Sequence, residues 1–190
     1  MGVYLKAMII EVLLSTKSVG GEDNFAPMGM KRIDETMVLV RPFRDSRTWA
    51  NLNERGFAVA SITDSILPFV HAVVKDRLPD HFPAYLVPCG VIEDPCGWAE
   101  LELKRISLEG DRGHCLFEIA YEESRRPFEG FNRSRCAILE ALVAATRIHV
   151  RGKEPFLEEF RRAVELTDRT GGEEERLALR LIGELTGGIG

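Results

Sequence analysis

The sequence predicts an α+β fold that is mainly β: a small antiparallel barrel with inserted helices, followed by a C-terminal helical segment. Short apolar runs bounded by turn signals fill the first two thirds of the chain, without the regular alternation of strand and helix that a doubly wound parallel sheet needs. From residue 132 onward, apolar residues recur at helical spacing. We therefore expect a barrel over residues 1–131 and C-terminal helices over residues 132–190 that pack on it, as two domains or one continuous domain.

The first half of the chain contains the strands that open the barrel. Four mostly apolar runs predict strands at residues 8–15, 25–30, 37–41 and 57–62. A polar, glycine-rich loop closes the first of them. Pro27 has no N–H to donate to a neighbouring strand, so the second strand is expected at a sheet edge or beside a bulge.

Two helices are predicted between these strands and the middle of the chain. The first is capped by Asp45 or Ser46 and ends at Gly56. The second is expected over residues 66–76, with Ser65 as its N-cap candidate.

A proline-rich loop and a hairpin complete the predicted barrel. The loop covers residues 78–95 and is expected to enclose one short strand near residues 85–89. Apolar and charged residues then alternate over residues 98–106 and 117–121, which predicts two antiparallel strands with one buried and one solvated face. Gly110-Asp111 and Gly113 supply their connection.

The last third of the chain predicts helices and includes one of the four cysteines. A helix from Asn132 is expected to bury a broad apolar face, made of Cys136, Leu139, Leu142, Val143 and Thr146. Two further apolar-periodic segments are separated by Gly171-Gly172. The cysteines show no C-x-x-C spacing, so we interpret all of them as small buried hydrophobic residues: Cys89, Cys96, Cys115 and Cys136.

Composition excludes several classes of protein. The 190 residues contain 25 Lys and Arg against 30 Asp and Glu, a net charge of -5, which argues against a general nucleic-acid binder. The longest uninterrupted apolar run, residues 141–145, is far shorter than the ~20 residues that a membrane-spanning helix needs. The N-terminus does not resemble a signal peptide, so we expect a cytoplasmic protein.

Most catalytic signatures are missing, but one anion-binding pattern stands out. No Walker loop, G-x-G-x-x-G, G-x-S-x-G or H-E-x-x-H motif occurs, and the four histidines show no metal-ligand spacing, so we expect no metal site. Three arginines and two hydroxyl residues gather where the first helix begins: Arg41, Arg44, Arg47, Ser46 and Thr48. A helix start with cations and hydroxyls suits a phosphate monoester. In the structural alternative the arginines pair with Asp45 and Glu54, and Ser46 only caps the helix.

Several segments in order carry a resemblance to a known fold family. Residues 24–29 (N-F-A-P-M-G), 41–52 and 57–63 together resemble the opening of flavin-reductase-like proteins with the FMN-binding split barrel. Residues 130–133 (G-F-N-R), leading into 141–147, look like a prokaryotic family of unknown function within that fold. The resemblance covers most of the chain.

The resemblance implies a split β-barrel that binds FMN as a homodimer, with the flavin near the subunit interface. It assigns the isoalloxazine ring to the N-x-A-P strand, at Asn24, Ala26, Pro27, Met28 and Gly29. It assigns the phosphate to Arg41, Ser46 and Thr48, with Asn51 close by. Thr63 and Asp64 are weaker candidates for the ring or the ribitol. Asn132 and Arg133 match the second motif, and whether they contact flavin, contact substrate or cap the helix stays open.

The implied function is that of a flavin-dependent oxidoreductase, with a small-molecule electron donor or acceptor. No proton donor is evident in the sequence, so hydride or electron transfer would depend on the cofactor. Met28, Met30 and Phe43 are expected as apolar walls of the flavin slot, or the methionines as ordinary core residues. The alternative function is a non-catalytic module that holds flavin or another phosphorylated ligand as a sensor or carrier. The C-terminal helices are a candidate protein-interaction segment.

Overall fold

The computed structural model of this chain describes residues 8–73 and 78–185. They fall into two compact units. The barrel unit comprises residues up to Thr63 together with Asp80–Pro127, and the helical unit comprises Asp64–Pro79 together with the residues from Phe128 onward. The helical unit thus includes a segment from the middle of the chain, whereas the sequence suggested one boundary after residue 131.

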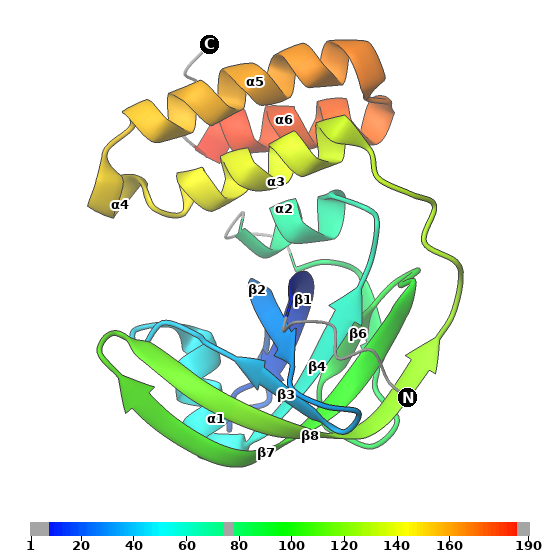
Figure 1. The fold of residues 1–190 in the computed structure, drawn as a ribbon, viewed down its shortest axis with the longest axis vertical. Coiled ribbons are helices and arrows are strands. Elements are labelled where there is room, and N and C mark those ends of the chain that lie inside the picture. The colour runs from blue at the N-terminus through cyan, green and yellow to red at the C-terminus, as the bar shows by residue number, and fades with distance from the viewer. Residues whose placement is uncertain (1–7, 74–77, 186–190) are drawn as a thin grey trace. The chain divides into compact units, whose positions relative to one another are not determined.

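The barrel unit is a closed antiparallel barrel, as predicted. Its strands follow one another around the barrel in the order β1-β2-β3-β8-β7-β4 (Figure 1). Their bounds are Ile9–Lys17 (β1), Asp23–Arg32 (β2), Met37–Val40 (β3), Phe57–Ile62 (β4), Gly97–Glu109 (β7) and Arg112–Ser124 (β8). The predicted hairpin is therefore correct, and both of its strands are longer than the alternating pattern indicated.

Strand β2 is shared unequally between its two neighbours. It pairs with β1 along its length, from Lys31 opposite Ile9 to Asp23 opposite Lys17. It pairs with β3 only through Met30, Lys31 and Arg32. Residues 23–29 therefore form an edge without a β3 partner, and Pro27 lies in it, which confirms the predicted edge position.

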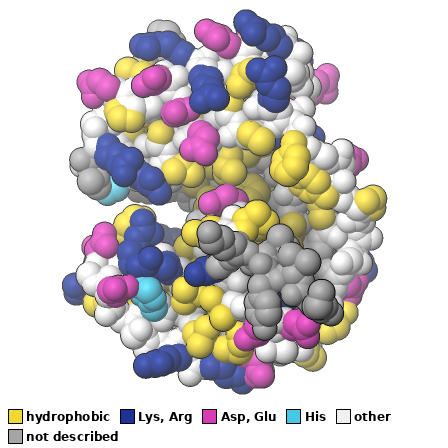
Figure 2. All heavy atoms as spheres, viewed as in Figure 1, with side chains coloured by type: hydrophobic (Ala, Val, Ile, Leu, Met, Phe, Trp, Pro, Cys, Tyr) yellow, Lys and Arg dark blue, Asp and Glu magenta, His cyan; other side chains and the backbone are white. Residues whose placement is uncertain are grey.

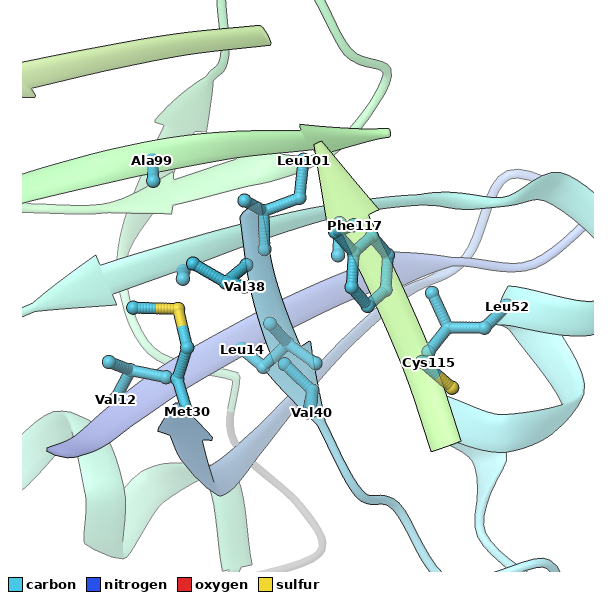
Figure 3. Packing of buried hydrophobic residues seen from close by; sticks show 12 residues of the cluster. Val12, Leu14, Met30, Val38, Val40, Leu52, Ala99, Leu101, Cys115 and Phe117 are labelled. Atoms are coloured by element: carbon cyan, nitrogen blue, oxygen red, sulfur yellow. The ribbon is translucent and has the colours of Figure 1, made fainter. Parts of the chain in front are cut away.

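The core of the barrel is built by alternate residues of the strands and closed by a helix. Val12 and Leu14 of β1, Met30 of β2 and Phe117 of β8 point toward one another (Figure 3), and Leu52 of α1 (Arg47–Arg55) belongs to the same cluster. Burying each such side chain contributes roughly 1.5–3 kcal/mol. Met30 is therefore a core residue, and its expected role as a wall of a flavin slot is wrong.

Helix α1 begins and ends as the sequence predicted. The Ser46 side chain accepts a hydrogen bond from the Trp49 N–H, so it is the N-cap. Gly56 ends the helix in the left-handed conformation with φ 70°, which favours glycine.

The strand predicted near residues 85–89 is wrong. Two short strands flank that segment instead, β5 (His81–Pro83) and β6 (Gly90–Ile92). The segment turns around the carboxylate of Glu100, which is 0% exposed. That carboxylate accepts the backbone N–H groups of Tyr85 (2.8 Å), Leu86 (2.6 Å) and Val87 (3.0 Å), as well as the indole N–H of Trp98 (3.2 Å). Donors bonded to a buried carboxylate are not free for a β-ladder.

The helical unit consists of helices joined by short loops. They are α2 (Leu67–Val73), α3 (Arg133–Ala145), α4 (Ile148–Arg151), α5 (Glu154–Thr170) and α6 (Glu173–Leu185). Part of the second predicted helix, residues 74–77, lies outside the described residues. The short α4 was not predicted. None of the described helices has the length and apolar character to cross a membrane.

The predicted apolar face of α3 is wrong in its phase. The buried residues of this helix are Ser134, Ala137, Ile138, Ala141 and Leu142. They follow one another at helical spacing, and Cys136 lies off that stripe and is exposed. Cys89, Cys96 and Cys115 are buried, as predicted. Burial raises the pKa of Cys89 and of Cys115 to about 12, with nearby Asp23 adding to the effect at Cys89, so both remain thiols.

Replacing Glu100 with Ala should destabilise the protein by about 3 kcal/mol, because three backbone N–H groups and one indole N–H lose a buried acceptor. Urea unfolding followed by tryptophan fluorescence measures the change, since Trp98 reports on this environment. Glu102→Ala is the matched control: Glu102 lies on the same strand, is half-buried and bonds Lys104. This control substitution should lower the free energy of unfolding by less than about 1 kcal/mol. Equal losses in the two variants would contradict the role of Glu100.

Candidate functional site

The segment between β3 and α1 is fixed by the end of the β7–β8 hairpin. The Arg44 N–H donates to the Asp111 carbonyl (3.0 Å), and the Gly113 N–H donates to the Pro42 carbonyl (2.8 Å). Phe43 forms an isolated β-bridge with Arg112. Residues 41–46 are therefore held in place by backbone contacts from a hairpin that lies far along the sequence.

The same hairpin is fitted closely against α1. A Cβ atom at Gly113 would lie 2.3 Å from Cζ3 of the Trp49 ring. No side chain fits in that space, so this position requires glycine. Trp49 lies in the first turn of α1, and this contact therefore fixes the start of the helix relative to the hairpin.

The predicted arginine cluster lies on the surface beside this helix start. Arg41 pairs with Glu109 (3.5 Å), and Arg44 pairs with Asp45 (3.7 Å). Arg47 is exposed and has no ion-pair partner among the described residues. Figure 2 shows basic side chains gathered on one part of the barrel unit, with acidic side chains and a histidine beside them. The structural alternative is therefore met in part: Asp45 pairs with Arg44, but no ion pair of Glu54 occurs among the described residues.

Arg112 is a fourth cation at this place that sequence reasoning missed. Its guanidinium lies over the Phe43 ring, 3.2 Å from the centroid, and its Nη1 donates to the Arg41 carbonyl (3.3 Å). Arg112 is 71 residues from Arg41 in the sequence. Only the pairing of the hairpin with the β3–α1 segment brings the two together, and no local signal could have found it.

Both predicted hydroxyl residues are engaged within the protein. The Ser46 hydroxyl donates to the Phe43 carbonyl (2.6 Å) and accepts from the Trp49 N–H (3.1 Å). Thr48 is 2% exposed, and its hydroxyl oxygen accepts from the Asn24 side-chain amide (3.2 Å). The backbone N–H groups of Arg47 and Thr48, at the start of α1, have no acceptor in the described part of the chain.

A buried polar network joins β1, β2 and α1. The hydroxyl oxygen of Thr16 accepts the side-chain amides of Asn24 (3.1 Å) and Asn51 (3.1 Å). Asn24 also donates to Thr48, so three of the predicted residues belong to one network: Asn24 and Asn51 bond Thr16, and Thr48 bonds Asn24. Sequence reasoning missed Thr16, which lies between the strand predicted at residues 8–15 and the polar loop after it. The network fixes the start of α1 against the open end of β2.

The other predicted residues of β2 are half-buried. Met28 packs against the barrel core, in agreement with its reading as a core residue. Ala26 and Pro27 lie on the part of the strand that β3 leaves open. A Cβ atom at Gly29 would lie 2.7 Å from Cγ2 of Ile9, so the neighbouring strand alone accounts for glycine there.

The remaining predicted residues divide between the units. Thr63 ends the first segment of the barrel unit, whereas Asp64, Asn132 and Arg133 belong to the helical unit. The Asp64 carboxylate accepts the Glu129 N–H (2.8 Å). Arg133 is exposed, and no partner for it occurs among residues 8–73 and 78–185.

Asn132 is the N-cap of α3. Its side-chain oxygen accepts the N–H groups of Ser134 (2.8 Å) and Arg135 (3.2 Å). Its side-chain nitrogen donates to the Thr170 carbonyl at the end of α5 (3.0 Å). Of the three roles left open for Asn132, helix capping is the one observed.

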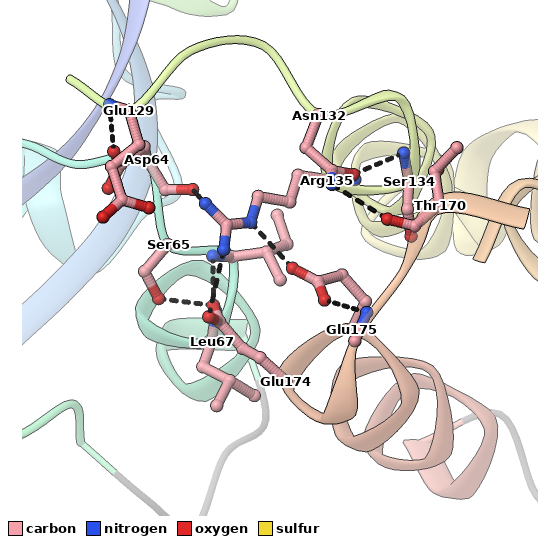
Figure 4. Close-up of polar contacts among 12 residues, drawn as sticks. Asp64, Ser65, Leu67, Glu129, Asn132, Ser134, Arg135, Thr170, Glu174 and Glu175 are labelled. Atoms are coloured by element: carbon pink, nitrogen blue, oxygen red, sulfur yellow. Dashed lines mark hydrogen bonds and ion pairs between the residues drawn. The ribbon is translucent and has the colours of Figure 1, made fainter.

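Arg135 is the centre of an ionic network in the helical unit (Figure 4). Its Nε lies 2.7 Å from Oε1 of Glu175, its Nη2 lies 3.5 Å from Oε2 of Glu174, and its Nη1 donates to the Asp64 carbonyl (2.8 Å). The Glu174 carboxylate also accepts the N–H groups of Ile66 and Leu67, where α2 begins. Burial opposes ionisation of Glu175, but hydrogen bonds from Arg135 and Gly172 outweigh it and lower the pKa of Glu175.

Two family models match the chain. One, described as the N-terminal domain of a protein of unknown function (DUF447), matches residues 10–126. The other, described as a protein of unknown function (DUF447), matches residues 132–184. No curated protein matches the sequence.

Solved structures with the same fold include flavin-binding proteins. An FMN-bound protein of the DUF447 family from Methanosarcina mazei is 24% identical, with a TM-score of 0.81 over 95% of this chain and 96% of that one. A Streptomyces globisporus NADH:FAD oxidoreductase is 13% identical, with a TM-score of 0.53 over 60% and 70% of the two chains. An FMN-binding protein from Thermus thermophilus with bound p-hydroxybenzaldehyde is 16% identical, with a TM-score of 0.52 over 65% and 76%. These similarities show a shared fold.

Replacing Thr16 with Val should destabilise the barrel unit by about 1–3 kcal/mol, because the buried amide of Asn51 and the half-buried amide of Asn24 lose their shared acceptor. Thr16→Ser keeps the hydroxyl and should cost less than about 1 kcal/mol. Urea unfolding measured by tryptophan fluorescence compares the two. If valine were tolerated as well as serine, the network would have no role in stability.

The helical unit should lose stability in acid through Glu175. The pKa of Glu175 is lower in the folded state than in the unfolded state. The ionised carboxylate therefore contributes to the free energy of unfolding above its ordinary pKa of 4.5, and this contribution is lost as the pH falls through the lower folded-state pKa. Glu175→Gln should therefore cost about 2 kcal/mol near neutral pH, and its difference from wild type should shrink below pH 4.5. Urea unfolding at each pH measures this, with far-UV circular dichroism following the helices. A difference independent of pH would contradict it.

Proposed function

Because this chain belongs to the DUF447 family, we propose that it is an FMN-binding protein and that the bound FMN serves oxidoreductase chemistry. One observation carries the proposal: Asn24, at the start of the open part of β2, is hydrogen-bonded to Thr48 in the first turn of α1. An open strand edge and an anion-binding helix start therefore adjoin. An elongated ligand with a flat ring system and a terminal phosphate matches that pair of features.

The phosphate end of the proposed site is the start of α1. The backbone N–H groups of Arg47 and Thr48 are available there, and the positive end of the helix dipole favours an anion. Arg47 has no competing carboxylate in the described chain, and Arg41 makes only a long, exposed pair with Glu109. These two arginines would supply charge-assisted hydrogen bonds. Ser46 would contribute mainly by capping the helix.

The ring end of the proposed site is the open edge of β2. Because Pro27 has no N–H to donate, we expect the main-chain groups at this residue to face away from β1. Alternation then directs the main-chain groups of Phe25 and Gly29 to the same open edge, where they would bond the pyrimidine side of the ring. The stretch from Asn24 to Gly29 spans roughly 17 Å, which is long enough for an extended ligand.

Several predicted residues act on the flavin indirectly in this proposal. The amides of Asn24 and Asn51 both donate to Thr16, and Asn24 also donates to Thr48, so these residues position the helix start against the strand. Asp64 and Asn132 stabilise the helical unit. Thr63 and Arg133 remain candidates for contact with the ribitol or the substrate.

The chemistry of the proposed function belongs to the cofactor. When bound, FMN transfers a hydride or electrons through its ring system. The chain's own residues bind its phosphate, orient its ring and leave one ring face for a small-molecule electron donor or acceptor. We include in the proposal a homodimer with the flavin near the subunit interface, as the family resemblance implies.

Addition of FMN to the purified chain, followed by desalting and an absorbance spectrum, tests flavin binding. Retention of the flavin spectrum supports the proposal, and its complete loss from folded protein overturns it. Stopped-flow mixing with reduced nicotinamide and other donors then tests the oxidoreductase role. Tight binding without reduction by any donor would favour a sensor or carrier instead.

Arg41→Ala and Arg47→Ala should each weaken FMN binding by roughly tenfold and leave riboflavin binding unchanged, because only FMN has the phosphate. Fluorescence titration of both flavins measures the difference. Arg161→Ala removes an exposed arginine of α5 that has no role in the proposed site, and it is the control for a general loss of charge. Equal weakening of FMN and riboflavin by a variant would exclude that arginine from the phosphate site.

A further inference from the structure

Glu109, at the end of β7, contacts two basic side chains through one carboxylate oxygen. Its Oε2 lies 3.5 Å from Nη2 of Arg41 and 2.6 Å from Nε2 of His114. The Glu109 side chain is 73% exposed, so it can turn toward either base without disturbing the barrel core. The base that attracts the carboxylate more strongly takes it from the other. Glu109 is therefore divided between His114 and an arginine of the proposed phosphate site.

The strand register places Arg41 and His114 next to each other. Val40 pairs with Cys115 at the end of β3, and the backbone contact continues beyond this pair as an isolated bridge. The same register puts Arg41 directly opposite His114. Because Val40 and Cys115 belong to the core cluster, Arg41 and His114 point to the outer face of the barrel. Residues opposite each other on neighbouring strands have their Cβ atoms about 5 Å apart.

The charged groups around His114 are mostly cations. They are Arg105 and Glu109 on β7, Arg41 on the β3–α1 segment, and Arg112 on its own strand. Among these neighbours in the described chain, Glu109 is the one acid. An imidazolium at His114 is therefore attracted by Glu109 and repelled by the arginines. A phosphate bound to Arg41 would weaken that repulsion and would also release Glu109 from Arg41.

We propose that Glu109 and His114 regulate the proposed phosphate site through Arg41. When His114 is neutral, Glu109 pairs with Arg41 and competes with the phosphate of the ligand. When His114 is protonated, its charge-assisted contact draws Glu109 away, and the Arg41 guanidinium is open to the phosphate. This inference rests on the proposed function.

The regulation acts in both directions. Histidine is the side chain that ordinarily changes its charge between about pH 5 and about pH 8. A lower pH in this range therefore favours phosphate binding through Arg41. By thermodynamic linkage, a bound phosphate favours the protonated form of His114 by the same factor.

Titration of FMN into the full chain at about pH 8 and at about pH 5 tests the proposal. At about pH 8, Glu109→Gln should bind FMN about threefold more tightly than wild type, because an exposed ion pair with Arg41 no longer competes. At about pH 5 the two should bind equally, whereas His114→Gln should bind about threefold more weakly than wild type. The phosphate of FMN itself titrates in this range, so proteins are compared at the same pH.

Two matched controls remove the same chemical groups elsewhere. Glu118→Gln removes a carboxylate of the same hairpin that pairs with Lys104, and His149→Gln removes an exposed histidine of α4. Both should bind FMN as wild type does at each pH. Riboflavin lacks the phosphate and should bind every variant equally, which also shows that each variant is folded.

The combination of Glu109→Gln with His114→Gln identifies the route of the effect. It should match Glu109→Gln alone at both pH values. Weaker FMN binding than Glu109→Gln at about pH 5 would mean that His114 acts on the ligand directly, and it would overturn the proposal. Equal FMN binding by wild type and Glu109→Gln at about pH 8 would overturn it as well.

The same titrations separate this inference from the function on which it rests. FMN binding by wild type without the differences among variants overturns the regulation alone. Absence of FMN binding by folded wild type overturns the proposed function, and the regulation with it.

Discussion

The unequal pairing of β2 is the constraint on which the barrel unit depends. The strand is bonded to β1 along its length but to β3 only at Met30–Arg32, so the barrel closes at one end and leaves an edge at the other. Helix α1 follows β3 directly, and its start is tied to that edge through Asn24 and Thr48. Both ends of the proposed flavin site therefore arise from one feature of the strand register.

A buried and a half-buried carboxylate hold backbone segments in both units. Glu100 gathers three successive backbone N–H groups of the loop between β5 and β6. In the helical unit, Glu174 accepts the N–H groups at the start of α2 while it also faces Arg135. In each unit a carboxylate from another element accepts hydrogen bonds from backbone N–H groups, as a β-ladder or a local cap does in other proteins. Some of the chain's acidic side chains therefore accept hydrogen bonds from its own backbone.

The elements predicted correctly are those specified by neighbouring residues. Ser46 and Gly56 bound α1 through local caps, and alternation identified β7 and β8. The strand predicted near residues 85–89 does not form, because Glu100 accepts the backbone N–H groups of that segment. The sequence pattern alone does not show that Glu100 contacts this segment. For the candidate site, the sequence predicted the residues of two segments, 24–29 and 41–51. Thr16 and Arg112 were missed because only the tertiary fold brings them there.

The internal bonding of Asn24, Ser46 and Thr48 changes how the candidate site must work. Their polar groups are already paired within the protein. Redirecting Asn24 to a ligand would leave its buried partners Thr16 and Thr48 without their hydrogen bonds, at a cost of about 1–3 kcal/mol each. Binding energy for an anion must then come from groups that lose little on binding: the free N–H groups of the first turn and exposed guanidinium groups. The buried residues hold those groups in position before the ligand arrives. Preorganisation of this kind suits a protein whose chemistry resides in its cofactor.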